Sequence, residues 1–333
     1  MHDVGHKSSG LKCSNIRIVS RDIGDSTFAN VNVCKIVKRG RPSRELYAVK
    51  TFYVAQMRRS QCAVFGPHDK VKVRSGMYQL NREIGILREL KGSSSHIVDL
   101  EFVVGMNNSA ILMFTKYAGS PIMQFCTENL FYSALVDDGL FRKRQTPSNP
   151  STLFEEDVCM CLFQLLEAVS FVHAAGIVHK DIKPDNILLR VPLSRWRCDG
   201  NSFANDDRQP IHLTLCDFNM SERGGPTIYD AQGTTLFTPP ECFTSKKKGI
   251  NGFARDIWSV GILAHCLLLG RPPIVFMEPI RIQFALIGLQ APPELLNATP
   301  KLEKFVRSLL DLKPKKRPSA RNAMLNIESI LLA

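Results

Sequence analysis

A run of polar side chains between His179 and Asn186 has residue types and a spacing that could carry out chemistry. The segment fits the frame His-x-Asp-x-Lys-x-x-Asn and leads into the apolar stretch 187–189. Phosphoryl transfer needs a base for the attacking hydroxyl, cations over the phosphates and held metal ions. In this frame Asp181 would accept the hydroxyl proton, Lys183 would neutralise the moving phosphate and Asn186 would hold a magnesium ion. The pattern therefore favours metal-assisted phosphoryl transfer.

A second acidic site, Asp217-Phe218-Asn219, follows the strand-like stretch 212–216. An aspartate directly after a buried strand can bridge a metal ion and the phosphates from a fixed position. We therefore predict that Asp217 is a metal ligand together with Asn186.

From about residue 16 to residue 332 the chain resembles the eukaryotic protein kinases, on these two motifs and on others. Tyr47-Ala48-Val49-Lys50 resembles the strand whose lysine grips the α- and β-phosphates of ATP. Glu83 stands where the regulatory helix of the family supplies the glutamate that pairs with this lysine. The resemblance implies ATP and Mg²⁺ as cofactors and a protein hydroxyl as the phosphate acceptor.

The second half of the chain carries matches to the larger kinase lobe. Pro239-Pro240-Glu241 resembles the end of the activation segment, and the resemblance implies an ion pair between Glu241 and Arg317. Asp256 matches the aspartate of the central buried helix, which hydrogen-bonds the catalytic-loop backbone and is scaffold rather than chemistry. The hydrophobic column that joins the lobes in active family members would consist of Leu87, Leu100, His179 and Phe218.

The adenine pocket is expected beside the hinge 115–118, with Thr115 as the gatekeeper at its back. Apolar contacts dominate such pockets, so aliphatic side chains should sandwich the ring. The residues assigned to ATP binding are Ile23, Gly24, Val31, Ala48, Lys50, Glu83, Thr115, Tyr117, Ala118 and Leu188.

The phosphate loop, residues 23–31, departs from the family pattern. Of the three usual glycines only Gly24 is present, and Ser26 and Ala29 stand in for the others. Glycines let backbone N–H groups approach phosphates closely, so we expect a working loop of lower affinity. Asn219 replaces the glycine of the Asp-Phe-Gly motif, and asparagine tolerates a left-handed backbone well enough to keep that turn.

The lost glycines raise a second hypothesis, a pseudokinase that binds nucleotide as a scaffold without efficient catalysis. Pseudokinases generally lack at least one of the side chains that the chemistry requires. All of them are present here, which favours an active enzyme: Lys50, Glu83, Asp181, Lys183, Asn186 and Asp217.

Smaller details indicate the substrate class. Lys183 and Thr234 are typical of the serine/threonine branch of the family. Lys180, where most members have arginine, and the segments 232–241 and 251–259 are similar to the liver kinase B type. Those kinases phosphorylate the activation loop of AMP-activated protein kinase, and a pseudokinase and a helical-repeat scaffold switch them on.

Lys180 also bears on activation. A lysine is a point charge that cannot grip a phosphothreonine with two parallel bonds as arginine does. We therefore expect a partner protein to hold Glu83 against Lys50. We expect activity not to depend on phosphorylation of Thr227, Tyr229, Thr234 or Thr235.

These side chains must be positioned by strands in the first half of the chain and helices in the second. β-branched or alternating runs predict strands over 16–18, 32–36, 46–52, 97–104 and 110–114, and apolar residues at helical spacing predict a helix over 78–90. Further helices are predicted over 158–173, 254–269, 301–310 and 319–332.

The expected architecture is an α+β, bilobal kinase fold over residues 16–332. The β-rich lobe with one regulatory helix would cover about 16–116, the hinge 116–120 and the helical lobe 121–332. Polar loops or inserts are expected at 54–76, 137–151 and 192–210.

Composition limits the class of protein and its cellular compartment. Hydrophobic residues make up 44% and charged residues 22%, which excludes a disordered or fibrous chain. The ten cysteines include no Cys-x-x-Cys pair, so we expect free thiols rather than disulfides or zinc. No signal segment or membrane span is expected, which favours an intracellular protein of the cytoplasm or the nucleus. The net charge of +12 permits a nucleic-acid partner, but charge alone makes no strong case for one.

Overall fold

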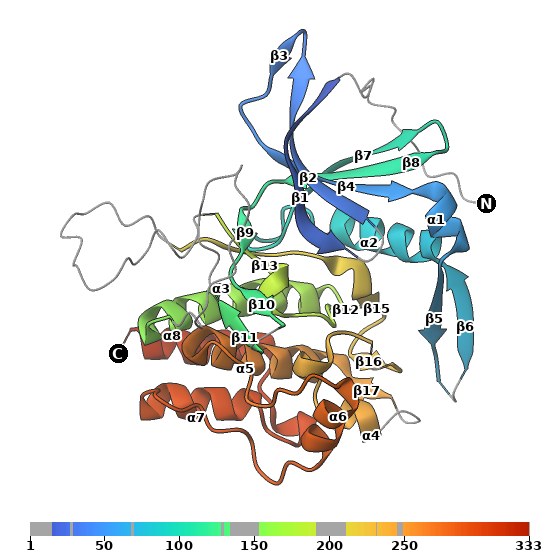
Figure 1. Cartoon of the computed structure of the whole chain (residues 1–333). Helices are drawn as coiled ribbons and strands as arrows, with labels where there is room; N and C mark the ends of the chain where they lie inside the picture. The colour runs from blue at the N-terminus through green and yellow to red at the C-terminus, as the bar shows by residue number, and fades with distance from the viewer. Residues whose placement is uncertain are drawn as a thin grey trace, which may run out of the picture.

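The computed structural model describes residues 15–26, 29–67, 70–127, 130–133, 153–190, 211–230, 232–244 and 249–332. A strand-rich region comes first in the chain and a helix-rich region follows, stacked one above the other in Figure 1. This arrangement confirms the expected α+β fold of two lobes.

The first lobe is built on an antiparallel sheet with the strand order β1-β2-β4-β8-β7. On β4, Val49 packs with Cys34 and Phe114 in a cluster on one face, whereas Ala48 and Lys50 face the other side, because successive strand residues alternate in direction. All five predicted strands are present with shifted ends. They are β1 (Ile16–Ser26), β2 (Ala29–Lys38), β4 (Tyr47–Tyr53), β7 (Leu100–Met106) and β8 (Ala110–Lys116), with β3 (Arg41–Pro42) paired to β2.

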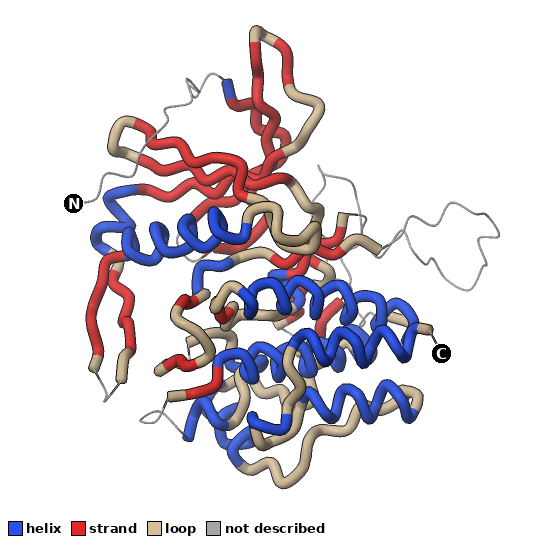
Figure 2. Tube along the Cα trace, turned by 180° about the vertical axis from the view of Figure 1, so that it is seen from behind, coloured by secondary structure: helices blue, strands red, loops and turns tan. Residues whose placement is uncertain are grey.

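Helix α2 (Gly76–Leu90) lies against this sheet, as Figure 2 shows from behind. The predicted apolar positions Leu80, Ile84, Leu87 and Leu90 are all buried, so the 3.6-residue spacing identified the packed face. Glu83 is on the same helix and is 2% exposed.

The segment 54–76 is not the loop that its polar composition predicts. It forms the short helix α1 (Val54–Arg59) and a two-stranded ribbon of β5 (Gln61–Phe65) and β6 (Val71–Ser75), which projects from the lobe in Figures 1 and 2. The ribbon reaches the activation segment, where the Gln232 side chain donates a hydrogen bond to the Ala63 carbonyl at 3.3 Å. The expected inserts 137–151 and 192–210 lie outside the described residues.

The second lobe is helical. Its centre is α5 (Gly252–Leu269), whose N-cap Asn251 accepts a hydrogen bond from the Ala254 N–H. Helix α5 and α3 (Glu155–Ala174) are long and apolar enough to cross a membrane, but 89% of the α5 window is buried inside the protein, as in any core helix. The other helices are α4 (Glu241–Thr244), α6 (Pro279–Ile287), α7 (Pro300–Leu309) and α8 (Ala320–Leu331), of which α4 and α6 were not predicted.

Short strands near the junction of the lobes hold the loops that carry the site. The catalytic loop runs between β12 (Ile177–Val178) and β13 (Ile187–Leu189), and β13 pairs with β14 (Leu213–Leu215), which ends just before Asp217. The remaining pairs are β9 (Ser120–Pro121) with β13, β10 (Gln124–Cys126) with β11 (Phe131–Ser133), β12 with β15 (Glu222–Arg223), and β16 (Thr227–Ile228) with β17 (Ile250–Asn251).

Candidate active site

Asp256 on α5 fixes the backbone of the catalytic loop. Its carboxylate is fully buried and accepts hydrogen bonds from the backbone N–H groups of His179 at 2.8 Å and Lys180 at 2.9 Å. Burial alone would raise the pKa of Asp256, but the hydrogen bond from His173 and the nearby imidazole groups hold it below the usual value. The predicted contact is therefore present, and Asp256 stays ionised while holding Lys180 in a left-handed conformation with φ 72°.

Asp181 lies at the centre of the loop and is 8% exposed. Its Oδ1 accepts hydrogen bonds from the Thr234 hydroxyl at 2.7 Å and the Thr234 N–H at 3.0 Å. Its Oδ2 accepts one from Asn186 at 3.0 Å and lies 3.3 Å from the Lys183 ammonium. Burial would raise the pKa of Asp181, but the charge of Lys183 and the Thr234 hydrogen bonds lower it. The carboxylate is thus ionised at neutral pH and able to accept a proton.

Lys50 on β4 bridges the two lobes. Its ammonium lies 3.1 Å from Glu83 on α2 and 2.6 Å from Asp217 after β14. Burial would lower the pKa of Lys50, but the two carboxylates, Asp217 first, raise it, so the lysine remains charged. The predicted Lys50–Glu83 pair is present in the structure of the single chain.

The two predicted metal ligands, Asn186 and Asp217, both line the cavity between the lobes and carry side-chain oxygen atoms. The Asn186 amide N–H₂ donates to the Asp181 carbonyl at 2.8 Å and to its carboxylate, which leaves the Asn186 amide oxygen for another partner. Among the described residues no group of three or more His, Cys, Asp or Glu side chains could hold a metal ion by itself. Magnesium typically binds through one or two carboxylates plus phosphates and water, and this oxygen donor set fits that habit.

The turn after β14 differs from the sequence expectation. The left-handed residue is Asp217, with φ 63°, whereas Asn219 lies in a 3₁₀ turn and has no positive φ. The Asn219 carbonyl accepts hydrogen bonds from Gln79 and Arg82 on α2, each at 3.2 Å. Asparagine at this position therefore needs no glycine-like conformation, and its backbone ties the turn at 217–219 to helix α2.

A cavity between the lobes coincides with the predicted adenine site. Eight of the ten residues assigned to ATP binding line it; the side chain of Ile23 and the surroundings of Gly24 lie outside what the structure describes, although Gly24 pairs with Val31 in the β1–β2 ladder. The cavity measures about 120 Å³, below the range of about 300–1,000 Å³ typical of ligand sites, so a whole nucleotide needs more room than this conformation encloses.

Sequence reasoning missed part of this lining, namely Met113 and Cys216. Met113 precedes Thr115 by two residues on β8, so strand alternation could have identified it. Burial raises the pKa of Cys216 to about 12, which keeps this thiol protonated and unreactive at neutral pH.

The scaffold predictions for the larger lobe also have counterparts in the structure. Glu241 receives two hydrogen bonds from the Arg317 guanidinium, at 2.6 and 2.9 Å, and this guanidinium lies 4.8 Å from the centre of the Trp258 ring. The rings of His179 and Phe218 meet edge to face at 4.7 Å, and Leu87 and Leu100 are buried in the same core cluster as Phe218.

Lys180 has partners that the sequence did not indicate. Its ammonium is almost fully buried and lies 2.7 Å from Asp230 and 3.2 Å from Glu222, both C-terminal to the metal-binding turn. Nearby, Arg255 donates hydrogen bonds to the carbonyls of Lys180 and Gln232. Two carboxylates thus neutralise the cation that would meet a phosphate in relatives with a phosphorylated loop.

Gly233 allows the activation segment to pass close to the catalytic loop. Its φ is 135°, and a Cβ atom there would lie 2.6 Å from the Lys180 carbonyl and 2.5 Å from Arg255. Any larger residue would push Thr234 away from Asp181.

Known proteins share these features over most of the chain. The family model described as protein kinase domain matches residues 18–326. The serine/threonine-protein kinase DCLK3 of Homo sapiens is 25% identical over 311 residues, covering 91% of this chain and 38% of that protein. The serine/threonine-protein kinase SBK1 of Danio rerio is 25% identical over 283 residues, covering 75% and 69%. CBL-interacting protein kinase 25 of Oryza sativa subsp. japonica is 32% identical over 260 residues, covering 75% and 42%. This chain spans less than two fifths of DCLK3, and over nearly all of its own length it belongs to the protein kinase domain family.

Proposed function

We propose that the protein is an active serine/threonine kinase that transfers the γ-phosphate of Mg-ATP to a protein hydroxyl. The observation that carries the proposal is the setting of Asp181. A hydroxyl, that of Thr234, already donates to this ionised carboxylate at 2.7 Å, and a cation, Lys183, lies 3.3 Å from it. A base within hydrogen-bond reach of a hydroxyl is the geometry that phosphoryl transfer requires.

The contacts suggest a role for each side chain in the reaction. A substrate hydroxyl that reaches Asp181 would lose its proton to that carboxylate as it attacks the γ-phosphate. Lys183 would stay beside the transferred group and offset its negative charge, and Lys50, held by Glu83, would orient the α- and β-phosphates. Asp217 and Asn186 would hold Mg²⁺, which neutralises phosphate charge when bound.

Thr234 supports the preference for serine and threonine acceptors. Its hydroxyl donates to Asp181 and accepts from Lys183 at 3.1 Å, so it locks the base and the cation together. The similarity of 232–241 to the liver kinase B type is the basis for proposing AMP-activated-kinase-type targets, and a pseudokinase and scaffold as candidate partners, inside the cell.

A nucleotide-binding scaffold is the second candidate. The serine and alanine in the phosphate loop favour it. The contacts made by Asp181, Lys50 and Asp217 favour catalysis, because the side chains that phosphoryl transfer requires are all present. For that reason we prefer the kinase to the scaffold.

Phosphate transfer tests the two directly. The purified protein is incubated with radiolabelled Mg-ATP and either an AMP-activated kinase α-subunit or a generic basic protein, with and without candidate partners. We expect label on serine or threonine, and a rate that falls about 10²–10⁴-fold in Asp181→Asn, since a general base contributes roughly that factor. If the wild type transfers nothing under any of these conditions, or Asp181→Asn is equally fast, the scaffold candidate replaces the kinase.

A further inference from the structure

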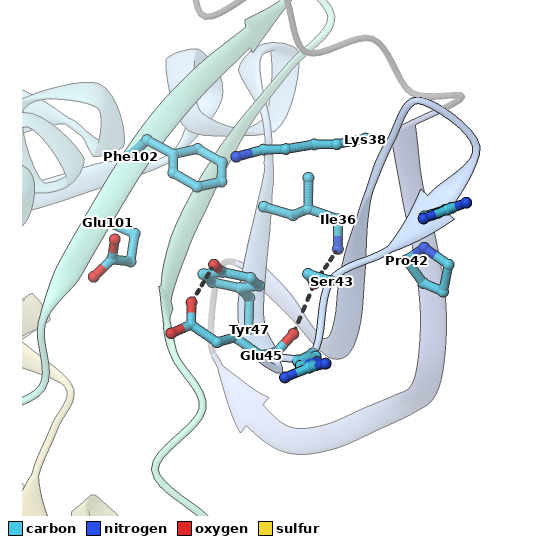
Figure 3. A pocket seen from close by; sticks show the side chains of 10 residues that line it. Ile36, Lys38, Pro42, Ser43, Glu45, Tyr47, Glu101 and Phe102 are labelled. Atoms are coloured by element: carbon cyan, nitrogen blue, oxygen red, sulfur yellow. Dashed lines mark hydrogen bonds between the residues drawn. The ribbon is translucent and has the colours of Figure 1, made fainter.

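A second and larger cavity lies on the opposite side of the small-lobe sheet. It measures about 650 Å³, within the range of ligand sites, and is drawn in Figure 3. Tyr47 lines it, whereas the next residue, Ala48, lines the adenine cavity, because neighbours on a strand point to opposite faces. No residue lines both cavities, so the two sites can be altered separately.

The floor of this cavity is apolar and aromatic. Tyr47 and Phe102 lie with ring centres 6.1 Å apart, and Phe102 stacks on Phe114 of the core at 4.5 Å. The Ile36 side chain lies between the Lys38 chain and the Tyr47 ring in Figure 3, where the Lys38 amine points toward Phe102. Such a floor suits one aliphatic or aromatic side chain.

The wall is preformed by hydrogen bonds. The Ser43 hydroxyl accepts from the Ile36 N–H at 3.0 Å and donates to the Glu45 carbonyl at 2.8 Å, and the Ser43 N–H donates to the Ile36 carbonyl at 2.7 Å. These bonds pin the turn after β3 to strand β2. A ligand would therefore meet an ordered surface, which lowers the entropy that binding costs.

The carboxylates around the cavity have partners, whereas three of its cations have no ion-pair partner among the described residues. Glu45 accepts a hydrogen bond from the Tyr47 hydroxyl at 2.8 Å, and Glu101 lies 3.8 Å from the Lys116 ammonium, so both carboxylates are engaged. Burial, followed by the bond to Glu45, raises the pKa of Tyr47 to about 12, which keeps the phenol neutral. Three exposed cations on the rim make no ion pair with any carboxylate in the part of the chain that the structure describes: Lys38, Arg41 and Arg44.

We propose that this cavity binds an extended acidic segment of a partner protein. One apolar side chain of the segment would rest on Tyr47 and Phe102, and flanking carboxylates would pair with Lys38, Arg41 and Arg44. Three cations without an ion-pair partner in the described ranges outnumber the two engaged carboxylates of the lining and favour an anion, and the apolar floor favours a peptide over a small inorganic ion. The proposal does not depend on catalysis, because a scaffold could use the same surface.

Fluorescence anisotropy tests it on the full chain with a labelled peptide, Asp-Asp-Glu-Phe-Glu-Asp-Asp. The variant is the double substitution Arg41→Glu and Arg44→Glu. The matched control is Lys301→Glu and Lys304→Glu, which makes the same charge change at exposed positions on α7. We expect saturable binding by the wild type. The affinity should fall about tenfold or more in the cavity variant, which loses its direct ion pairs with the peptide, and less than about twofold in the control, which loses none. The thermal shift with Mg-ATP should be the same in all three proteins.

Four outcomes would overturn the proposal. Equal weakening in both double variants would show general electrostatic attraction. Equal affinity for the peptide with serine in place of phenylalanine, or displacement by millimolar inorganic phosphate, would show an anion site without a peptide preference. Absence of saturable binding by the wild type would show that the cavity does not take acidic peptides.

Discussion

Replacing Asp230 by asparagine tests whether built-in carboxylates substitute for a phosphate in the activation segment. Asp230 is 8% exposed and its carboxylate bonds both the Lys180 ammonium, at 2.7 Å, and the Gln232 N–H, at 3.0 Å. Asp230→Asn keeps the shape but removes the charge beside an ammonium whose side chain is 1% exposed. The lysine would then depend on Glu222 alone.

The size of the effect follows from burial. Removing one partner of a buried ion pair costs about 3–5 kcal/mol, and the remaining Glu222 should reduce this to about 2–3 kcal/mol. Glu222→Gln is the matched comparison. The Glu222 side chain is 22% exposed and lies farther from Lys180, at 3.2 Å, so we expect a loss of about 1 kcal/mol or less. Lys180→Met in the Asp230→Asn background removes the incompletely compensated buried charge and should recover much of the stability.

Urea denaturation measures these free energies of unfolding, and phosphate transfer measures activity on the same samples. We expect Asp230→Asn to lower activity, because Gln232 and Thr234 lose an anchor next to Asp181. Phosphatase treatment of the wild type should leave activity unchanged. Equal losses for Asp230→Asn and Glu222→Gln, or loss of activity after phosphatase treatment, would refute the reasoning.

The remaining predictions concern metal, base and pH. Asp217→Ala should abolish the thermal shift by Mg-ATP because it removes the metal bridge, whereas Asp181→Asn should keep that shift while slowing transfer, with a barrier higher by roughly 3–5 kcal/mol. His265 is 1% exposed, its Nε2 has no hydrogen-bond partner among the described residues, and burial lowers its pKa to about 4. As the pH falls, the imidazole of His265 is protonated in the unfolded chain before it is protonated in the folded protein. His265 therefore lowers the free energy of unfolding between about pH 6.5 and about pH 4, by about 3 kcal/mol in total. Urea titrations at pH 7.5 and pH 5 should show a smaller loss in His265→Met; an unchanged loss would contradict the assignment.

The catalytic side chains could be predicted from the sequence because the chemistry fixes their types and their local spacing. Asp181, Lys183 and Asn186 share one loop, so the frame that names them also brings them together. Helix α2 could be predicted for a similar reason, since its packed face follows a 3.6-residue period.

The ribbon β5–β6 could not be predicted, because its strands have five residues each and β6 is exposed on both faces apart from its last residue. Without a buried face there is no alternation of polar and apolar residues to identify. The cavity beside Tyr47 escaped detection because Glu101 and Phe102 of β7 join the rest of the lining, from β2, β3, the turn at 43–45 and β4, only in the folded sheet.

Lys180 shows how a local rule and the fold complement each other. The sequence predicts that a lysine there grips a phosphate poorly, and this leads to the expectation that activity depends on a partner protein rather than on loop phosphorylation. In the structure Asp230 and Glu222 reach the lysine across fifty and forty-two positions of sequence. Spacing of that length encodes no contact, and neither acidic residue stands out beside a catalytic motif. A lysine is also the better choice for this arrangement, because two carboxylates that approach from different parts of the chain can share a compact ammonium with three donors, without the planar geometry that a guanidinium imposes.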